Sequence, residues 1–261
     1  MSRDNGARQR HLMLTIFFNR SLSKQQQARL PQPGSVIASS FTSPIDPVYL
    51  AAIFDPVFTA AYPNTRQVQR ISLIQAILRA FAPPSTRPEP GAQLVDVATL
   101  VEKYPNRPIV IFPECTTTNS RAILPLSRAL LGVPAQTKIF PVSLRYTPVD
   151  VVTPLPGSYI SFLWTLLSRP THCIRVRIAE YVTNSPISEA APARSTRQST
   201  YNTNYLDTLD QESADATASE KLLLDQVGEA LARLGRVKRV GLGVKEKQDF
   251  VRMWSKTRRT W

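Results

Sequence analysis

The sequence predicts an α/β fold, in which a mixed, largely parallel sheet is flanked by helices and a basic helix follows at the C-terminus. Short β-branched runs alternate with segments of helical periodicity, which is typical of such sheets. Hydrophobic residues make up 43% of the 261 residues, enough for a sizeable core. The formal net charge is +13, and residues 233–261 hold ten Lys or Arg against two acids.

The strands are predicted from runs of β-branched and aliphatic residues. They span residues 35–39, 57–61, 94–95, 108–112, 138–146 and 172–178. The alternation of these runs with helical segments favours parallel pairing. We expect residues 108–112 to form the central strand.

The helices are predicted from apolar residues at helical spacing. They span residues 44–54, 68–81, 97–101, 122–131, 159–167 and 220–234. Ser43 and Asp96 are suitable N-caps, and Pro44 suits the first helical position. Pro83 and Gly132 are suitable stop signals.

Composition divides the chain into four parts. Residues 1–30 are a basic segment that we expect to be flexible, and residues 31–182 form the α/β domain. Residues 183–218 are rich in Ser, Thr, Asn and Pro, which predicts a flexible linker. Residues 219–261 form the basic C-terminal helix and tail, whose charge favours an anionic surface.

Segment 159–167 is apolar on most faces and contains Tyr159 and Trp164. An interfacial helix that sinks into lipid head groups has this composition. A buried helix has it too, and we expect the buried helix.

A candidate anion site follows the strand 108–112. Pro113 ends the strand, because proline has no N–H for a sheet ladder. A carboxylate and small polar residues come next, before a predicted helix that opens near residue 121. Free N–H groups and the helix dipole would suit an anion there, and an arginine could grip a phosphate. The candidate ligand-binding residues are Glu114, Cys115, Thr116, Thr117, Asn119 and Arg121.

This segment resembles the F-P-E-G-T block of the glycerolipid acyltransferases, the lysophosphatidate acyltransferase superfamily. Phe112, Pro113, Glu114 and Thr116 match the block, and Cys115 stands where the family has glycine. The Thr- and Asn-rich form of the block is similar to that of fungal lysophosphatidic acid acyltransferases related to a vacuolar-sorting protein.

Two further blocks support the resemblance. The family motif N-H-x-x-x-x-D corresponds to residues 40–46, where Ser43, Pro44 and Asp46 fit the pattern but Phe41 replaces the histidine. Residues 138–145 look like the V-P-V strand of the family. The resemblance covers residues 35–180.

The resemblance implies an O-acyltransferase that moves a fatty acyl group from acyl-CoA to a lysophospholipid, most simply from lysophosphatidic acid to phosphatidic acid. In the family, the histidine is the general base, the aspartate orients it, and the Glu-Thr block binds the glycerol phosphate. No cofactor is implied, because acyl-CoA is a co-substrate. Such substrates suit a protein at the cytosolic face of the endoplasmic reticulum membrane or of a lipid droplet, on an anionic membrane surface.

Asp46 is the candidate catalytic residue, because Phe41 cannot accept a proton. An ordinary aspartate has a pKa near 3.9, which makes it a weak base. Loss of a positioned base costs a factor of about 10²–10⁴ in rate. Asp46 could instead serve only in a capping box, reaching back to the Ser43 N–H.

Three other functions remain open. A catalytically weakened relative would bind lysophospholipid or anionic membrane without turnover, and Phe41 favours it. A cysteine hydrolase could use Cys115 as nucleophile and His172 as base. A nucleic-acid binder would need aromatic stacking residues in the basic tail, where only Phe250, Trp254 and Trp261 qualify, so we expect no nucleic-acid partner. No group of residues has the spacing of a metal site.

Overall fold

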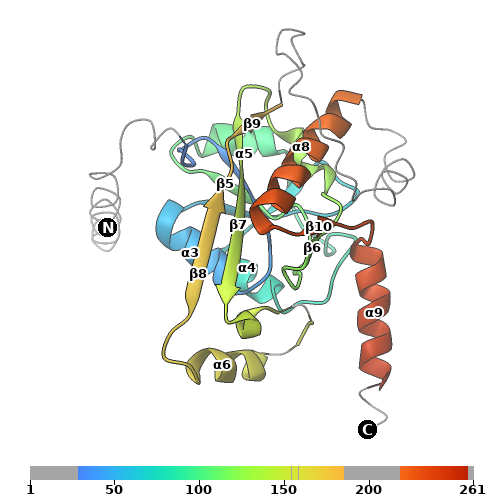
Figure 1. Cartoon of the computed structure of the whole chain (residues 1–261). Helices are drawn as coiled ribbons and strands as arrows, with labels where there is room; N and C mark the ends of the chain where they lie inside the picture. Colours follow the sequence, from blue (N-terminus) through green and yellow to red (C-terminus); the bar gives the residue numbers. More distant parts are fainter. Residues whose placement is uncertain (1–28, 154, 158, 185–217, 258–261) are drawn as a thin grey trace, which may run out of the picture.

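A single mixed sheet forms the centre of the molecule, as the computed structural model in Figure 1 shows. The structure describes residues 29–153, 155–157, 159–184 and 218–257. Its main sheet has the order β4-β3-β2-β5-β1-β7-β8, with β9 paired to β7. The strands are β1 (Val36–Ser39), β2 (Val57–Ala60), β3 (Val68–Ile71), β4 (Leu94–Val95), β5 (Ile109–Ile111), β7 (Lys138–Thr147), β8 (Cys173–Ile178) and β9 (Val182–Thr183).

The middle of the sheet is parallel and its edges are antiparallel. Strands β2, β5, β1 and β7 run in parallel, whereas β3, β4, β8 and β9 are antiparallel to their neighbours. All three residues of β5 are fully buried, as expected for a parallel strand covered on both faces. The predicted fold class and the central position of this strand are confirmed.

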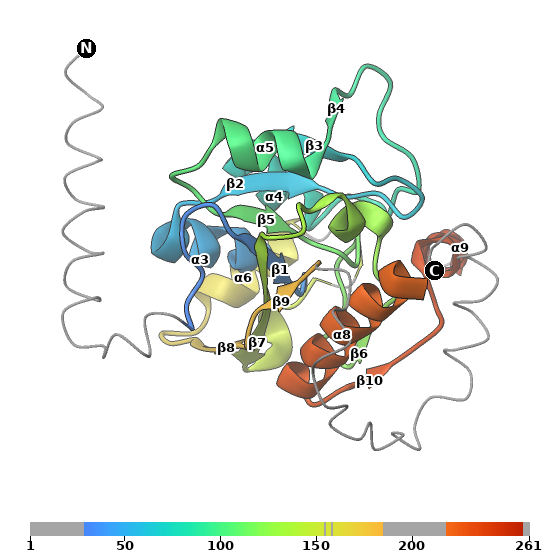
Figure 2. The same ribbon diagram turned by 90° about the horizontal axis from the view of Figure 1, so that it is seen from above.

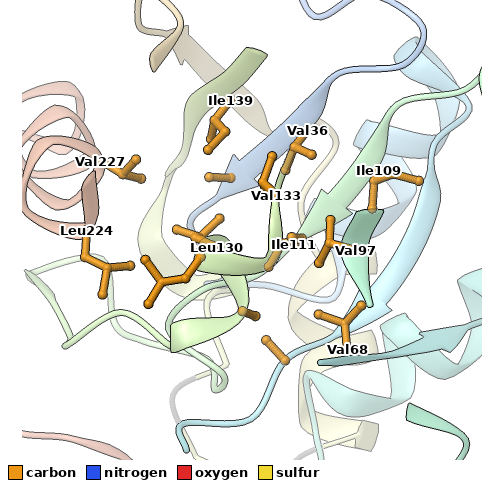
Figure 3. Packing of buried hydrophobic residues seen from close by; sticks show 14 of the residues in the cluster. Val36, Val68, Val97, Ile109, Ile111, Leu130, Val133, Ile139, Leu224 and Val227 are labelled. Carbon is orange, nitrogen blue, oxygen red and sulfur yellow. The ribbon is translucent and has the colours of Figure 1, made fainter. Parts of the chain in front are cut away.

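Helices cover both faces of the sheet. The described helices are α3 (Ile45–Phe54), α4 (Leu73–Arg79), α5 (Val97–Lys103), α6 (Tyr159–Leu167), α8 (Ala218–Gly235) and α9 (Val244–Thr257), with 3₁₀ turns η1 (Arg128–Gly132) and η2 (Val149–Val151). One core cluster joins the sheet to α5, η1 and α8, and Figure 3 shows Leu224 and Val227 directed toward Ile139 and Leu130. The other cluster joins the opposite face to α3, α4 and α6.

The C-terminal segment completes this core. Helix α8 lies alongside β7 in Figure 2, and Leu223, Val227 and Leu231 are buried in the first cluster. The next residues form β10 (Lys238–Arg239), which pairs in parallel with β6 (Ala122–Ile123) as a second small sheet. Helix α9 then projects from the body (Figure 1).

The predicted helix over residues 68–81 is wrong in its first third. Residues 68–71 form β3, which pairs antiparallel with β2. The helix starts only after Ser72, whose hydroxyl accepts a hydrogen bond from the Gln75 N–H at 3.3 Å while the Gln75 side chain accepts one from the Ser72 N–H at 2.8 Å. This capping box is the sequence signal that marks the true start.

The predicted helix over residues 122–131 is also wrong in its first half. Ala122 and Ile123 form β6, because residues 238–239 supply a strand partner from the far end of the chain. Pro125 follows, and only Arg128–Gly132 is helical, as a 3₁₀ turn. Residues 122–131 therefore place no α-helix N-terminus after the 113–121 turn, and the helix-dipole site predicted there is wrong.

Helix α6 is not the buried helix that we expected. Phe162 is its one buried residue, whereas Ile160 is 84% exposed, Trp164 77% and Leu167 79%. The expected flexible segment 1–30 and the expected linker 183–218 lie mostly outside the described residues. Among the helices that are described, none combines the length and the apolar character needed to cross a bilayer.

Candidate active site

The two sequence blocks meet at the carboxyl ends of neighbouring parallel strands, since β1 pairs with β5. The Thr118 N–H donates a hydrogen bond of 2.9 Å to the Phe41 carbonyl oxygen, which ties the two loops together. The ring of Phe41 stacks on that of Phe112, with centroids 4.4 Å apart. An aromatic pair therefore occupies the place where the resembled family has its histidine.

Asp46 is fully buried and its carboxylate is satisfied inside the protein. Oδ2 accepts hydrogen bonds from the Thr42 N–H at 2.6 Å, the Thr42 hydroxyl at 3.2 Å and the Ser43 N–H at 2.9 Å. Oδ1 accepts the phenol hydrogen of Tyr146. Burial raises the pKa of Asp46 to about 6, and these hydrogen bonds oppose the increase. The geometry is that of a residue that holds the 42–43 loop and Tyr146 in place.

Only one of the two hydrogen bonds of the capping box predicted for Asp46 is present. The Ser43 N–H does bond the Asp46 carboxylate, but the Ser43 hydroxyl donates to the Val151 carbonyl oxygen at 2.6 Å. The N-cap of α3 is Pro44, one residue later than predicted. Sequence reasoning missed Tyr146, which lies on β7 and reaches Asp46 only because β7 pairs with β1.

Glu114 is fully buried, and one of its oxygens is free. Oε2 accepts a hydrogen bond of 3.1 Å from the Leu124 N–H, whereas Oε1 has no hydrogen-bond partner among the described residues. Burial raises the pKa of Glu114 to about 8, opposed by the Leu124 and Phe41 N–H groups and by the charge of Lys247. The Phe41 N–H lowers the pKa of Glu114, although the two groups do not meet the geometry of a hydrogen bond. Oε1 of Glu114 is thus available to accept a hydrogen bond from a bound molecule.

Cys115 adopts the left-handed backbone conformation, with φ of 59°. Glycine reaches this region without steric cost, which accounts for the glycine in the resembled block. Burial raises the pKa of the Cys115 thiol to about 12, so the neutral thiol is strongly favoured. His172 bonds the Leu166 carbonyl oxygen instead, and no contact with Cys115 is seen in the described part of the chain. These contacts do not support a cysteine hydrolase.

Thr116 and Thr117 are buried and contact a lysine that sequence reasoning did not single out. Lys247 of α9 donates through Nζ to the Thr116 hydroxyl at 2.8 Å, to the Thr117 hydroxyl at 3.2 Å and to the Thr117 carbonyl oxygen. Burial lowers the pKa of Lys247 to about 8, and the charge of Glu114 opposes this decrease. No local pattern around residue 247 marks this contact, because it depends on where α9 begins.

Asn119 and Arg121 lie at the exposed end of the turn. The Asn119 side chain accepts a hydrogen bond of 3.1 Å from the Arg121 N–H, and both residues are exposed. The structure therefore groups Glu114, Thr116 and Thr117 with Lys247, and leaves these two residues outside the buried group.

Two small cavities adjoin Cys115. One, of about 10 Å³, lies against Phe41, Phe112 and Arg79, and the other, of about 40 Å³, lies against Ser127 and residues 243–245 at the start of α9. Such volumes hold about one to three water molecules. The first turn of α9 thus forms a wall of the site. No cluster with metal-binding composition exists within the described ranges.

A largely parallel α/β domain that joins an S-P-I-D loop to a P-E-C-T-T loop is of the acyltransferase type. Residues 21–145 match the family Acyltransferase. The chain is 29% identical over 149 residues to a Schizosaccharomyces pombe protein provisionally named lysophosphatidic acid:oleoyl-CoA acyltransferase. The match covers 57% of this chain, and the chain spans about half (49%) of that relative. No solved structure matches the chain. The chain is therefore similar to acyltransferases over about half of its length.

Proposed function

We propose that the protein transfers a fatty acyl group from acyl-CoA to a lysophospholipid, with lysophosphatidic acid as acceptor and phosphatidic acid as product. The family match and the name of the yeast relative support this reaction. The observation that carries it is the free Oε1 of Glu114, which is buried beside Lys247 and two threonines. Acyl-CoA is the co-substrate, and the reaction needs no cofactor.

Glu114 is the group in this site that can receive a proton. In the proposed step, the free hydroxyl of the acceptor donates its proton to Oε1 while its oxygen attacks the thioester carbonyl carbon. The C–S bond then breaks, and the departing CoA thiolate takes the proton from Glu114. With a pKa of about 8, Glu114 is ionised above that pH, and its carboxylate is then a stronger base than an ordinary one.

Asp46 has a positioning role in this proposal. All its observed contacts are to the protein, and it has no exposed surface. The reaction without the family histidine is expected to be slower by a factor of about 10²–10⁴. The alternative, a relative that binds lysophospholipid without turnover, rests on the Phe41–Phe112 stack, which leaves no imidazole at that position.

We further propose that the site end of the molecule docks on an anionic membrane. Helices α6 and α9 both lie at the end where β7 terminates (Figure 1), and both expose large apolar side chains. On α9, Phe250, Met253 and Trp254 are exposed at helical spacing, among lysines and arginines. The cytosolic face of the endoplasmic reticulum membrane or of a lipid droplet is the location that we propose.

Acyl transfer from labelled oleoyl-CoA to lysophosphatidic acid by the purified chain tests the reaction. We expect slow turnover by the wild type, none by Glu114→Gln and unchanged turnover by Asp249→Asn, an exposed carboxylate on α9. Turnover that persists in Glu114→Gln would exclude this residue as the base. Lipid binding without turnover by the wild type would favour the non-catalytic relative.

A further inference from the structure

Three arginines gather on one face of the β7–β8 strand pair. Arg145 of β7 lies directly opposite Arg175 of β8, and Arg177 follows two residues later on β8. Residues that are opposite each other in an antiparallel pair, or two apart on one strand, point to the same face of the sheet. Leu144 and Val176 pack in the second core cluster, so the arginines face the side of the sheet that α8 covers.

A fourth arginine comes from the end of α8. The helix ends beside β7 (Figure 1), and Nη1 of Arg177 donates a hydrogen bond of 2.7 Å to the Leu234 carbonyl oxygen. Desolvation lowers the pKa of Arg177, and the charges of Arg236, Arg175 and Arg145 lower it further. The four guanidinium groups are thus close enough to repel one another. Arg145, Arg175, Arg177 and Arg236 together form the arginine cluster.

Arg236 adopts the left-handed backbone conformation, with φ of 51°. The Arg236 N–H bonds the Arg233 carbonyl oxygen, and the Val237 N–H bonds the Ala232 carbonyl oxygen, which is the Schellman arrangement at a helix end. The left-handed position of this arrangement usually holds glycine, because a side chain there is strained. Arg236 therefore adds a charge to the cluster at a cost in backbone strain, and residues held in such strain are concentrated at functional sites.

The arginine cluster has no carboxylate partner in the part of the chain that the structure describes, because every salt bridge found there joins other residues. Like charges directly opposite each other destabilise a sheet. The bond from Arg177 to Leu234 caps α8, and a helix C-terminus favours nearby cations. One cap does not account for four arginines. Arg175 and Arg236 are exposed, so an anion in solution or on a surface can reach the cluster.

We infer that the arginine cluster binds a membrane lipid with a phosphomonoester head group, the class to which phosphatidic acid belongs. The inference rests on the proposed membrane docking and adds the lipid class that the surface recognises. Arg145 and Arg175 lie two residues from Thr147 and Cys173, at the end of the β7–β8 pair that leads into the segment with α6. This is the end of the molecule where α6 and α9 expose apolar side chains (Figure 1).

The chemistry and size of the cluster favour a phosphomonoester. Such a group carries up to two negative charges and three acceptor oxygens on one phosphorus, and guanidinium groups bind it in a bidentate manner. Opposite residues of a strand pair have Cβ atoms about 5 Å apart and diagonal ones roughly 7–8 Å, which is the scale of a single head group. Among the described residues, no hydrogen bond or ion pair joins the cluster to Glu114 or Lys247, so it is separate from the candidate active site.

Co-sedimentation with phosphatidylcholine vesicles tests the inference. We expect the wild type to bind vesicles that contain phosphatidic acid at least fivefold more tightly than vesicles with phosphatidylserine at equal surface charge. Arg175→Gln/Arg236→Gln should remove this preference. Arg175→Lys/Arg236→Lys keeps the charge but not the planar fork, so it should keep binding to phosphatidylserine and lose the preference. The control Arg70→Gln/Lys103→Gln removes two exposed charges beside Tyr104, toward the other edge of the sheet, and should behave as wild type.

Calorimetric titration with dihexanoyl phosphatidic acid separates the inference from membrane docking and from acyl transfer. The wild type should bind this soluble lipid, and Arg175→Gln/Arg236→Gln should bind it at least fivefold more weakly. The same loss should appear in a Glu114→Gln background, where the proposed base is absent. This result supports the inference even if the wild type neither sediments with vesicles nor turns over substrate.

Arg236→Gly separates a ligand contact from a structural role. Glycine relieves the left-handed strain while it removes the charge, so we expect a thermal stability equal to or above that of the wild type together with weaker binding of dihexanoyl phosphatidic acid. Unchanged binding by this folded variant would exclude Arg236 from the site.

Three further outcomes would overturn the inference. Equal affinity of the wild type and Arg175→Gln/Arg236→Gln for dihexanoyl phosphatidic acid would leave the cluster only a cap for α8. An equal loss on phosphatidylserine and phosphatidic acid vesicles would indicate attraction by charge without recognition of the head group. A preference of the wild type for CoA over dephospho-CoA that Arg175→Gln/Arg236→Gln abolishes would assign the cluster to the ribose phosphate of the co-substrate.

Discussion

Phe41 stacks on Phe112 with ring centroids 4.4 Å apart, while Tyr146 occupies Oδ1 of Asp46. The two contacts are linked through Asp46. A histidine in place of Phe41 would need a free carboxylate oxygen of Asp46, and Tyr146 already bonds Oδ1. The aromatic pair is 4–5% exposed, so it also closes the site toward the second core cluster. In this chain the position of the histidine in the resembled motif holds an aromatic ring, and Asp46 bonds Tyr146.

This relationship predicts that Phe41→His alone does not restore an efficient base. The new imidazole would meet an Asp46 whose Oδ1 is already engaged by Tyr146. The double variant Phe41→His/Tyr146→Phe frees that oxygen, and we expect at least tenfold higher kcat than in Phe41→His. Equal rates of the two variants in the acyl-transfer assay would show that Tyr146 does not block the pair.

The raised pKa of Glu114 predicts that the stability of the protein depends on pH. The folded protein holds a proton at Glu114 up to a pKa of about 8, whereas the unfolded chain loses it near the ordinary glutamate pKa of 4.5. The free energy of unfolding should therefore fall as pH rises from about 4.5 to 8. Asp46, with a pKa raised to about 6, contributes the same trend below pH 6.

Urea unfolding between pH 6 and 8 isolates the contribution of Glu114. Glu114→Gln cannot ionise, so we expect its slope of unfolding free energy against pH to be smaller than that of the wild type. Asp249→Asn, which changes an exposed carboxylate, should keep the wild-type slope. An unchanged slope in Glu114→Gln would show that this carboxyl does not titrate in the window.

Cys115→Gly distinguishes a packed thiol from a nucleophile. Glycine relieves a left-handed conformation that costs other residues roughly 1–2 kcal/mol, but it adds about 0.5–1 kcal/mol of unfolded-state entropy. We expect thermal stability equal to or slightly above that of the wild type, with acyl transfer retained. Loss of all activity in the folded variant would support the cysteine hydrolase.

Helix α8 should be required for stability, although it follows the 183–218 segment. Leu231 is fully buried against the sheet, so Leu231→Ala should lower the free energy of unfolding by about 2–5 kcal/mol. Leu222 on the same helix is 46% exposed, and Leu222→Ala should cost less than about 1 kcal/mol. Denaturant unfolding of both variants gives the comparison, and equal effects would mean that α8 does not complete the core.

The exposed apolar residues of α6 and α9 should mediate membrane docking. Trp164→Glu and Phe250→Glu each place a charge in these faces, and we expect at least fivefold weaker co-sedimentation with vesicles of anionic phospholipid. Leu222→Glu changes an exposed leucine on another helix and should bind as wild type. If the three variants bind alike, docking does not use α6 and α9.

Local sequence determined most of the sheet. The β-branched runs predicted β1, β2, β4, β5, β7 and β8 within one or two residues. Strands β1, β2, β5 and most of β7 are buried in the sheet, and their apolar composition reflects that burial. The motif blocks placed Asp46 and Glu114 at the ends of β1 and β5 for the same reason, since polar residues that follow parallel strands meet at one edge. The class of the protein followed from these blocks.

Tertiary structure alone decided the rest. Residues 122–123 form a strand because residues 238–239 pair with them. Helix α6 lies on the surface, and Phe162 is its one buried side chain. Tyr146 and Lys247 reach the site from residues 100 and 131 positions away from their partners, so no short sequence window contains both halves of either contact. The pKa values of Asp46 and Glu114 also depend on tertiary structure, because burial raises both of them while Tyr146 and Lys247 oppose the increase.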